Sequence, residues 1–324
     1  GAGIVIGLLM AIFFGWGSYK ISFIDSLLKG YEFISYDSRM RARTAGVEQM
    51  SIEDVVIIDI DNTSVGPIEE GGLGRYHNWP HAYHGELINT VSSGNPKALL
   101  FDVIFDEENT YKYDLVRALS SASNNRSNDL SEATNQFLYS NDPGKFVSAT
   151  ANSNQTYHAI VFEEEDTLNF LPKMLSEPEG YEFANHIIRG VSDEAKTKLP
   201  QADRIGNTYV DLLSASTGNG SANFPQDNDG VIRRAPTAIY FDGADHVYPS
   251  LVMSAVIDIL GIKKDGGFDY DFENNLLNLI DSTDTIVRTI PIDDNGRMYV
   301  NYFGKFQTFY YLPYSYCMDP EMLP

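Results

Sequence analysis

Two apolar runs that flank one helical pattern constrain the fold of this chain most strongly. Residues 55–61 read VVIIDID, and residues 98–106 read ALLFDVIFD. Neither run alternates strictly between apolar and polar residues, which is typical of strands buried on both faces. Residues 83–91, between the two runs, have the pattern of a helix. The stretch therefore predicts a right-handed βαβ unit with two parallel, neighbouring strands.

Acidic residues follow both predicted strands. Asp59, Asp61, Asp102 and Asp106 would then meet at one sheet edge, where open α/β sheets usually bind their ligands. Because Asp59 and Asp61 are two residues apart on a strand, they share a face and could offer oxygen ligands to Mg²⁺ or Ca²⁺. The alternative is that Asp61 caps the following turn and Asp102 accepts backbone hydrogen bonds. Such a metal needs more ligands than this stretch supplies, so no metal is predicted.

Three histidines raise the question of zinc. His77, His81 and His84 have a spacing that would suit zinc if all three lay on one helix. However, the Trp79–Pro80 pair interrupts any helix at that point. We therefore expect a loop followed by a helix start, with His84 in a capping or packing role.

The first nineteen residues carry no charged side chain. At 1.5 Å per residue, a helix of about that length nearly spans the hydrocarbon core of a bilayer, and Trp16 and Tyr19 would lie at the interface. We expect a transmembrane helix over residues 1–19, whereas a signal-peptide core would need a cleavage site that is absent. Residues 20–45 predict a stalk or docking helix. The basic residues in that helix argue against an external orientation of the domain after it.

The remainder of the chain predicts one mixed domain over residues 46–324. The expected fold class is α/β, with a mixed, largely parallel sheet, flanking helices and one preceding transmembrane helix. An apolar segment at 250–260 predicts a buried helix that ends at Gly261. Residues 113–139 predict a further helix. Strands are expected at 146–150, 157–162, 231–241, 275–280, 285–290 and 298–302, and one begins near 208–210.

Composition excludes several classes of function. The formal net charge of −22, from 45 acidic and 23 basic residues, argues against nucleic-acid binding. The lone Cys317 excludes an internal disulfide. Because the chain also lacks the nucleotide-binding, serine-hydrolase and zinc-protease motifs, we expect no enzyme activity and no cofactor.

Several short motifs occur in an order that resembles the CHASE2 domain, an extracytoplasmic sensory module of bacterial membrane receptors. The resemblance covers roughly residues 35–316. The motifs that carry it are YDSR at 36–39, VVIIDID at 55–61, WP at 79–80, YHGELI at 83–88, FDVIF at 101–105, Asp114, DNDGVIRR at 227–234, YPSL at 248–251 and GRMYVNYFG at 296–304. One departure is that the family usually has an arginine near the position of His81.

The resemblance implies a non-catalytic sensory or ligand-binding domain for signal transduction. It implies a single-pass protein of the bacterial cell membrane, with the main domain periplasmic or extracellular. The expected partners are the lipid membrane through residues 1–19, other proteins or a second copy of the chain, and an unidentified small ligand. The candidate ligand-binding residues are Asp59, Asp61, Trp79, His84, Asp102 and Asp114.

A second hypothesis is a single-span accessory or scaffolding subunit of a larger membrane protein complex. Relatives usually continue into further membrane helices and a cytoplasmic output domain, whereas this sequence stops at Pro324. The aromatic segment YYLPYSY at 310–316 would suit a surface that packs on the body of the domain or on a partner.

Overall fold

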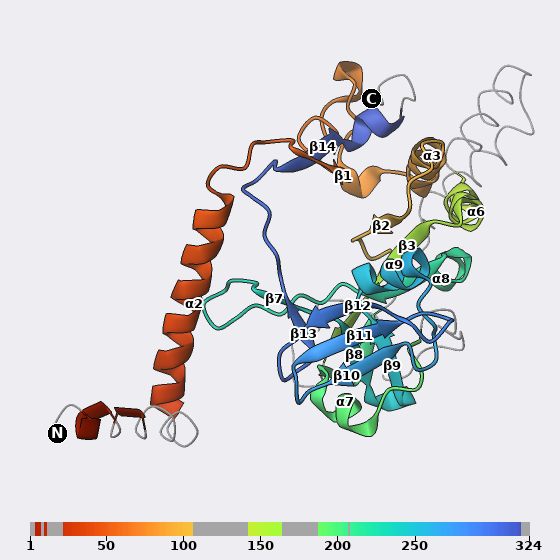
Figure 1. Cartoon of the computed structure of the whole chain (residues 1–324). Coiled ribbons are helices and arrows are strands. Elements are labelled where there is room, and N and C mark those ends of the chain that lie inside the picture. Colours follow the sequence, from red (N-terminus) through yellow and green to blue (C-terminus); the bar gives the residue numbers. More distant parts are fainter. Residues whose placement is uncertain are drawn as a thin grey trace, which may run out of the picture. The chain divides into compact units, whose positions relative to one another are not determined.

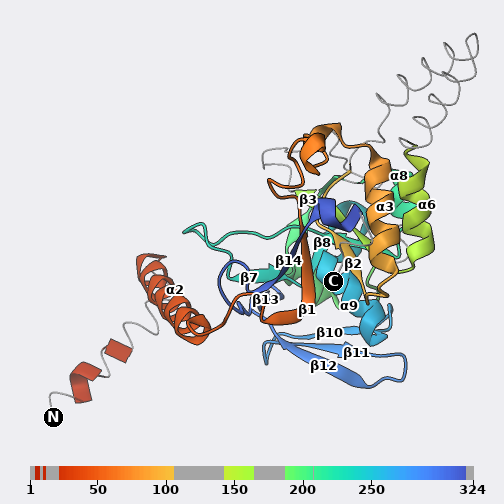
Figure 2. The same ribbon diagram turned by 90° about the horizontal axis from the view of Figure 1, so that it is seen from above.

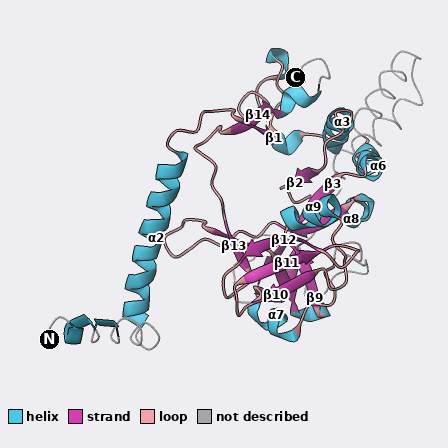
Figure 3. Ribbon diagram, viewed as in Figure 1, coloured by secondary structure: helices cyan, strands magenta, loops and turns pink. Residues whose placement is uncertain are grey.

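The computed structural model describes residues 4–7, 10–11, 22–105, 142–163, 187–206 and 208–318. Helices and strands are interspersed along these ranges, so the predicted α/β class is confirmed (Figures 1 and 3). The predicted span at residues 1–19 and the predicted helix at 113–139 lie largely or entirely outside them. Among the helices that are described, none combines the length and the apolar character needed to cross a bilayer.

The chain is organised as two compact units. Unit 1 joins residues 1–58 to residues 301–312, and unit 2 contains residues 59–300 and 313–324. The backbone therefore passes between the units at three points, after residues 58, 300 and 312.

Unit 1 combines the beginning of the chain with a segment near its end. Helix α2 (Ser22–Thr44) confirms the helix predicted for residues 20–45. Strand β1 (Ile52–Asp59) pairs with β14 (Phe309–Pro313) in a two-stranded sheet. Next to this pair, the Met50 amide donates to the Gln307 carbonyl at 2.8 Å. The Arg43 guanidinium donates to the Tyr302 carbonyl at 2.8 Å, which attaches the end of α2 to the returning segment.

The predicted βαβ unit is wrong in its pairing. Helix α3 (His81–Ser92) and the two flanking strands form as predicted, although the second strand, β2 (Leu99–Phe101), is short. However, β1 pairs with β14, and β2 pairs in parallel with β3 (Thr156–Glu163). Local apolar patterning places a residue in a strand, but the partner of β1 comes from a segment about 250 residues away, which that pattern does not encode.

Unit 2 contains several small sheets instead of one large one. Parallel strands β2, β3 and β6 (Gly218–Ser221) form its central ladder, which β5 (Arg204–Gly206) extends in the antiparallel direction. Three further sheets have the orders β4-β8-β9, β13-β7 and β10-β11-β12. Their bounds are β4 Gln201–Ala202, β7 Arg234–Pro236, β8 Ala238–Phe241, β9 His246–Pro249, β10 Phe268–Asp271, β11 Leu276–Ile280, β12 Ile286–Pro291 and β13 Arg297–Tyr299.

Most of these strand pairs are antiparallel, so the expected largely parallel sheet is wrong. The reason is that short hairpins such as β10–β11–β12 dominate the later part of the chain, and hairpin connections can only join antiparallel strands. The strands expected at 275–280 and 285–290 are confirmed as β11 and β12, whereas β13 covers only the start of the strand expected at 298–302.

Two faces of β3 are covered by different helices. Tyr157 and Ala159 pack against α9 (Leu251–Leu260), whose start is capped by the Ser250 hydroxyl. This confirms the predicted buried helix and its end at Gly261, which has a φ of 65°. His158 points to the other face and contacts Phe146 of helix α6 (Gly144–Ser153). Helices α3, α6 and α8 (Val210–Ala215) lie side by side in Figure 2.

Two predicted strands are helices. Residues 146–150 lie inside α6, and the residues after Tyr209 begin α8. The buried residues of α6, Phe146, Ala149 and Thr150, have the i, i+3, i+4 spacing of a helix that packs along one face. Tertiary packing has therefore overridden the strand preference of an aromatic and β-branched run. The remaining short helices are α7 Asp193–Lys198, η1 Ile68–Glu70, η2 Tyr76–Asn78, η3 Asp242–Ala244 and η4 Tyr314–Met318.

Candidate functional site

The Trp79–Pro80 pair sets the start of α3. Pro80 has an extended conformation and precedes the first helical residue, where its missing N–H costs no helical hydrogen bond. Trp79 is buried, and its indole Nε1 donates to the Gly74 carbonyl at 2.9 Å. The turn is therefore anchored at both residues, and it orients the first turns of α3 toward the interior of unit 2.

A glycine allows α3 and α6 to approach each other closely. A Cβ atom at Gly85 would lie 2.8 Å from the Lys145 carbonyl oxygen, closer than real Cβ contacts. Because Gly85 has no side chain, Phe146 of α6 reaches the His84 ring, with 5.2 Å between ring centroids.

His84 lies in the middle of a buried set of rings. Its centroid is 4.8 Å from that of Phe105, 5.7 Å from Tyr314 and 6.2 Å from Phe101. Edge-to-face contacts of this kind are favourable between aromatic rings. We call the whole set the aromatic cluster; its members are Trp79, His81, His84, Phe101, Phe105, Phe146, His158, Tyr209 and Tyr314.

One hydrogen bond ties the end of the described chain to this cluster. The Tyr314 hydroxyl lies 2.6 Å from His84 Nδ1, and both side chains are buried. Burial raises the pKa of the Tyr314 phenol well above its usual value, so the phenol keeps its proton at neutral pH and can donate it to the imidazole. The first residue of η4 is thereby fixed against α3.

Replacing Tyr314 with phenylalanine will lower the free energy of unfolding by about 1–3 kcal/mol, because a buried imidazole nitrogen loses its partner. Urea denaturation followed by fluorescence measures the change. The matched control is Tyr316→Phe in the same helix, where the side chain is exposed; we expect a change within about 0.5 kcal/mol. Equal effects of the two substitutions would contradict a role for the buried hydroxyl.

A second chain of hydrogen bonds lies beside the first. The Asp61 carboxylate accepts from the Ser64 amide at 2.8 Å and from the Ser64 hydroxyl at 2.7 Å. The Ser64 hydroxyl oxygen in turn accepts from the Ser315 amide at 3.0 Å. Burial by itself raises the pKa of Asp61, but the hydrogen bonds from Ser64 and Thr63 outweigh it, so the pKa lies below its usual value. Asp61 therefore remains ionised and holds the turn, as the capping alternative predicted.

We call Asp61, Ser64, His84, Tyr314 and Ser315 the clasp. It binds the residues that enter unit 2 after residue 58 to the residues that re-enter it after residue 312. Along the chain, β1 leads into the first of these segments and β14 leads into the second.

His158 forms the far end of the aromatic cluster. Its ring stacks on Phe101, with centroids 5.0 Å apart and an interplanar angle of 16°. The Thr150 hydroxyl lies 3.5 Å from its Nε2. Complete burial lowers the pKa of His158 to about 3, so the imidazole is neutral at physiological pH.

The structure places the six predicted site residues differently. Trp79 and His84 belong to the aromatic cluster, and Asp61 belongs to the clasp beside it. Asp114 lies outside the described residues.

The predicted meeting of Asp59 and Asp102 at one sheet edge is wrong. Asp59 is the last residue of β1, and Asp102 directly follows β2, but those strands pair with different partners. The Asp102 side chain is partly exposed, and desolvation by the surrounding protein raises its pKa. Within the described ranges, no three His, Cys, Asp or Glu side chains gather in an arrangement that could hold a metal ion.

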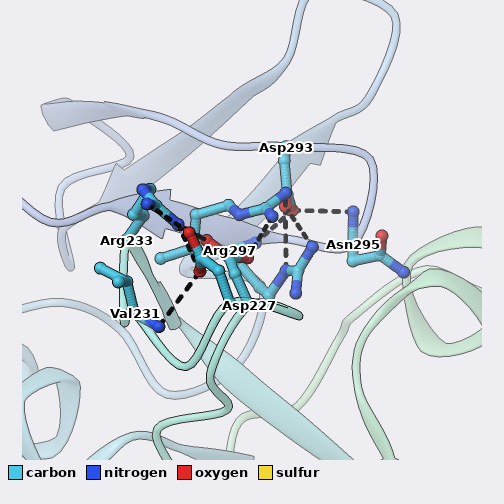
Figure 4. Close-up of polar contacts among 8 residues, drawn as sticks. Asp227, Val231, Arg233, Asp293, Asn295 and Arg297 are labelled. Atoms are coloured by element: carbon cyan, nitrogen blue, oxygen red, sulfur yellow. Dashed lines mark hydrogen bonds and ion pairs between the residues drawn. The ribbon is translucent and has the colours of Figure 1, made fainter. Parts of the chain in front are cut away.

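A network of arginines and aspartates connects two turns that carry family-like motifs (Figure 4). The Arg233 guanidinium donates to both carboxylate oxygens of Asp229, at 2.9 and 2.8 Å, and to Asp227 at 3.1 Å. Arg234 bonds to Asp227 and to Asp293, and Asp293 also accepts from Arg297 Nε at 2.9 Å.

The network lowers the pKa of Asp229 and of Asp293. The hydrogen bonds from Arg233 hold the pKa of Asp229 at about 2. Burial alone would raise the pKa of Asp293, but hydrogen bonds from Arg297 and Asn295 reverse that effect and bring it below the usual value. The connection of the turns at 227–230 and 293–296 through charged side chains was not predicted from sequence. The sequence feature that could have predicted this connection is the presence of arginines directly after each acidic turn.

The motifs that suggested a family thus occur in both units, and those in unit 2 include the charged turns and part of the aromatic cluster. A family model described as the CHASE2 domain matches residues 5–321, which is nearly the entire chain. The chain belongs to the CHASE2 domain family. CHASE2 domains are sensory domains, and the resemblance inferred from the motifs is therefore confirmed. No curated protein and no solved structure shows significant similarity to this CHASE2 domain.

Proposed function

We propose that this CHASE2 domain is the extracytoplasmic sensory part of a single-pass bacterial membrane protein and that the clasp transmits its state. The clasp carries the proposal, because it joins in unit 2 the two segments that continue as β1 and β14 of unit 1. Unit 1 also contains α2, which follows the predicted membrane span at residues 1–19. A change at the clasp would thus reach the segments closest to the membrane.

A sensor needs two states that its ligand binds unequally. The clasped state is held by two hydrogen bonds to η4, from the Ser315 amide to Ser64 and between Tyr314 and His84. Each contributes only about 1 kcal/mol net, so ligand binding of ordinary strength is sufficient to shift the balance. The aromatic cluster supplies the buried surface that such a ligand would rearrange.

The domain itself is proposed to be non-catalytic and to need no cofactor. Cys317 is buried, and burial raises the pKa of its thiol to about 11. The thiolate that nucleophilic chemistry needs is therefore scarce at neutral pH. Other partners in the proposal are the lipid membrane, a second copy of the chain or other proteins, and a small ligand, with no nucleic acid.

Labelling of a single cysteine in intact cells tests the proposed topology. In a Cys317→Ser background, Glu273→Cys places a thiol at an exposed position of unit 2. A maleimide that does not cross membranes should label this variant in spheroplasts, in the membrane fraction, without permeabilisation. The wild-type chain, with its buried Cys317, is the control and should remain unlabelled. Labelling of Glu273→Cys only after lysis would contradict an extracytoplasmic domain.

An accessory subunit of a larger membrane complex is the second candidate. Exposed apolar side chains of unit 1 favour it, since Tyr31 of α2 and Phe306 are 70% and 69% exposed. Gentle purification from native membranes followed by mass spectrometry separates the two candidates. Other membrane proteins in fixed stoichiometry would support the subunit, and recovery alone or as a homodimer would support the receptor.

A further inference from the structure

Polar side chains gather on one face of the central ladder. Strands β3 and β6 pair in parallel, with His158 directly opposite Asn219. Paired residues on neighbouring strands project to the same face, and so does a residue two positions away. Thr217, two residues before Asn219, therefore joins the face that carries His158.

These side chains hold buried polar atoms that lack hydrogen bonds. His158 is completely buried and Asn219 is 6% exposed. Within the described part of the chain, His158 Nδ1, Asn219 Oδ1 and Thr217 Oγ1 have no hydrogen-bond partner. More than nine in ten buried polar groups are paired in folded proteins, so three on one patch of two adjacent strands call for an explanation.

The chemistry of each atom and of its neighbours defines which ligand groups could supply the missing hydrogen bonds. The Thr150 hydroxyl lies near Nε2, so Nδ1 is the ring nitrogen of His158 that has no partner among the described residues; in the tautomer with its proton on Nδ1, it needs an acceptor. Asn219 Oδ1 needs a donor, and the Thr217 hydroxyl can serve as either. The apolar neighbours of His158 are the rings of Phe101 and Phe146, whose centroids lie 5.0 and 5.5 Å from that of His158.

The absence of charge on these neighbouring side chains narrows the class of ligand further. Burial keeps His158 neutral, since its pKa is lowered to about 3. An ionic ligand placed between a neutral imidazole, an amide and phenyl rings would find no counter-charge among them, and an unpaired buried charge is strongly unfavourable.

We propose that His158, Thr217 and Asn219 bind a small uncharged molecule that carries both an acceptor and a donor, with a primary amide as the simplest example. The inference rests on the proposed sensory function and names the chemical class of its ligand. The site is linked to His84 of the clasp by three rings that contact both histidines, Phe101, Phe105 and Phe146.

Titration with acetamide tests the proposal on the full chain. Acetamide has four non-hydrogen atoms, so its Kd should lie in the millimolar range, between about 1 and 50 mM. The readout is the NMR shift of selectively ¹⁵N-labelled histidine and asparagine side chains. Acetate, which has the same shape and a charge, should produce no saturable shift at these positions. Because this comparison uses the wild-type chain, it does not depend on a variant that folds.

Substitutions then locate the site. Asn219→Ala should weaken acetamide binding at least tenfold. Ser254→Ala is the matched control, since the Ser254 hydroxyl is also buried without a partner in the described chain but belongs to α9; acetamide binding should be unchanged.

Equal binding of acetate, unchanged binding in Asn219→Ala, or a crystal soaked in acetamide that shows only an ordered water between the three side chains would each overturn the proposal. None of these results bears on the cysteine-labelling test, which does not involve the ligand.

Discussion

Replacing Arg233 with methionine will lower the free energy of unfolding by about 3–5 kcal/mol. The Arg233 side chain is only 3% exposed and pairs with Asp227, which is 7% exposed, and with Asp229. Methionine fills much of the same volume but leaves Asp227 buried with fewer donors, and removal of one partner from a buried ion pair is costly. Urea denaturation of the purified chain, fitted with the wild-type m-value, gives the difference.

An exposed ion pair provides the control for this prediction. Lys263 pairs with Asp284, whose side chain is 82% exposed, while that of Lys263 is 30% exposed. Lys263→Met removes one cation, as Arg233→Met does, but should cost less than about 1 kcal/mol because exposed pairs contribute little. A comparable loss of unfolding free energy in the two variants would mean that stability depends on the total charge of the chain and not on the buried network.

Acidification will destabilise the protein through His158. In the unfolded chain a histidine binds its proton below about pH 6.5, whereas burial lowers the pKa of folded His158 to about 3. Between these values the unfolded state binds one more proton, so stability rises with pH. The same contribution is lost as the pH falls from 6.5 toward 3, at up to about 1.4 kcal/mol per pH unit.

His158→Phe isolates this effect from those of other titrating groups. Phenylalanine preserves an aromatic ring next to Phe101 and removes the titration. We expect the slope of unfolding free energy between pH 6 and pH 5 to be smaller by about 1 kcal/mol per pH unit in this variant than in the wild type. Parallel slopes would show that His158 is accessible to protons in the folded protein.

The parts of the fold that sequence predicted are those specified by local chemistry. Helix α9 is apolar, capped by Ser250 and ended by Gly261 in a left-handed conformation. The hairpin strands β11 and β12 are flanked by turn residues, which mark where each strand begins and ends. Helix α3 starts where the Trp79–Pro80 pair predicted an interruption, and this removed the geometry needed for zinc.

The parts that sequence did not predict depend on contacts between distant residues. Strand β1 has the apolar pattern of a central strand but pairs with β14 at the other end of the chain. Residues 146–150 have strand-forming side chains, but they form part of helix α6, which packs closely against α3.

The candidate site also divides into contacts that are local in sequence and contacts between distant residues. The role of Asp61 was predictable because its partner, Ser64, is three residues away. By contrast, 230 residues separate His84 from Tyr314. For His158, the only local indication of a buried role was its position within an apolar strand. Periodicity and motif spacing carry no information about such pairs.

The proposed control of unit 1 by the clasp can be tested by amide hydrogen exchange. In unit 1, the amides of Met50 and Ser51 donate to the carbonyls of Gln307 and Thr308. In unit 2, Ser64→Ala removes the acceptor of the Ser315 amide. Lys263→Met, also in unit 2, is the control and should leave exchange in unit 1 unchanged.

If the clasp stabilises the β1–β14 pair, Ser64→Ala will accelerate exchange of the Met50 and Ser51 amides about tenfold, which corresponds to about 1.4 kcal/mol of local opening free energy. The Ser315 amide should lose its protection in the same variant. Loss of protection at Ser315 with unchanged exchange at Met50 and Ser51 would contradict transmission through the clasp.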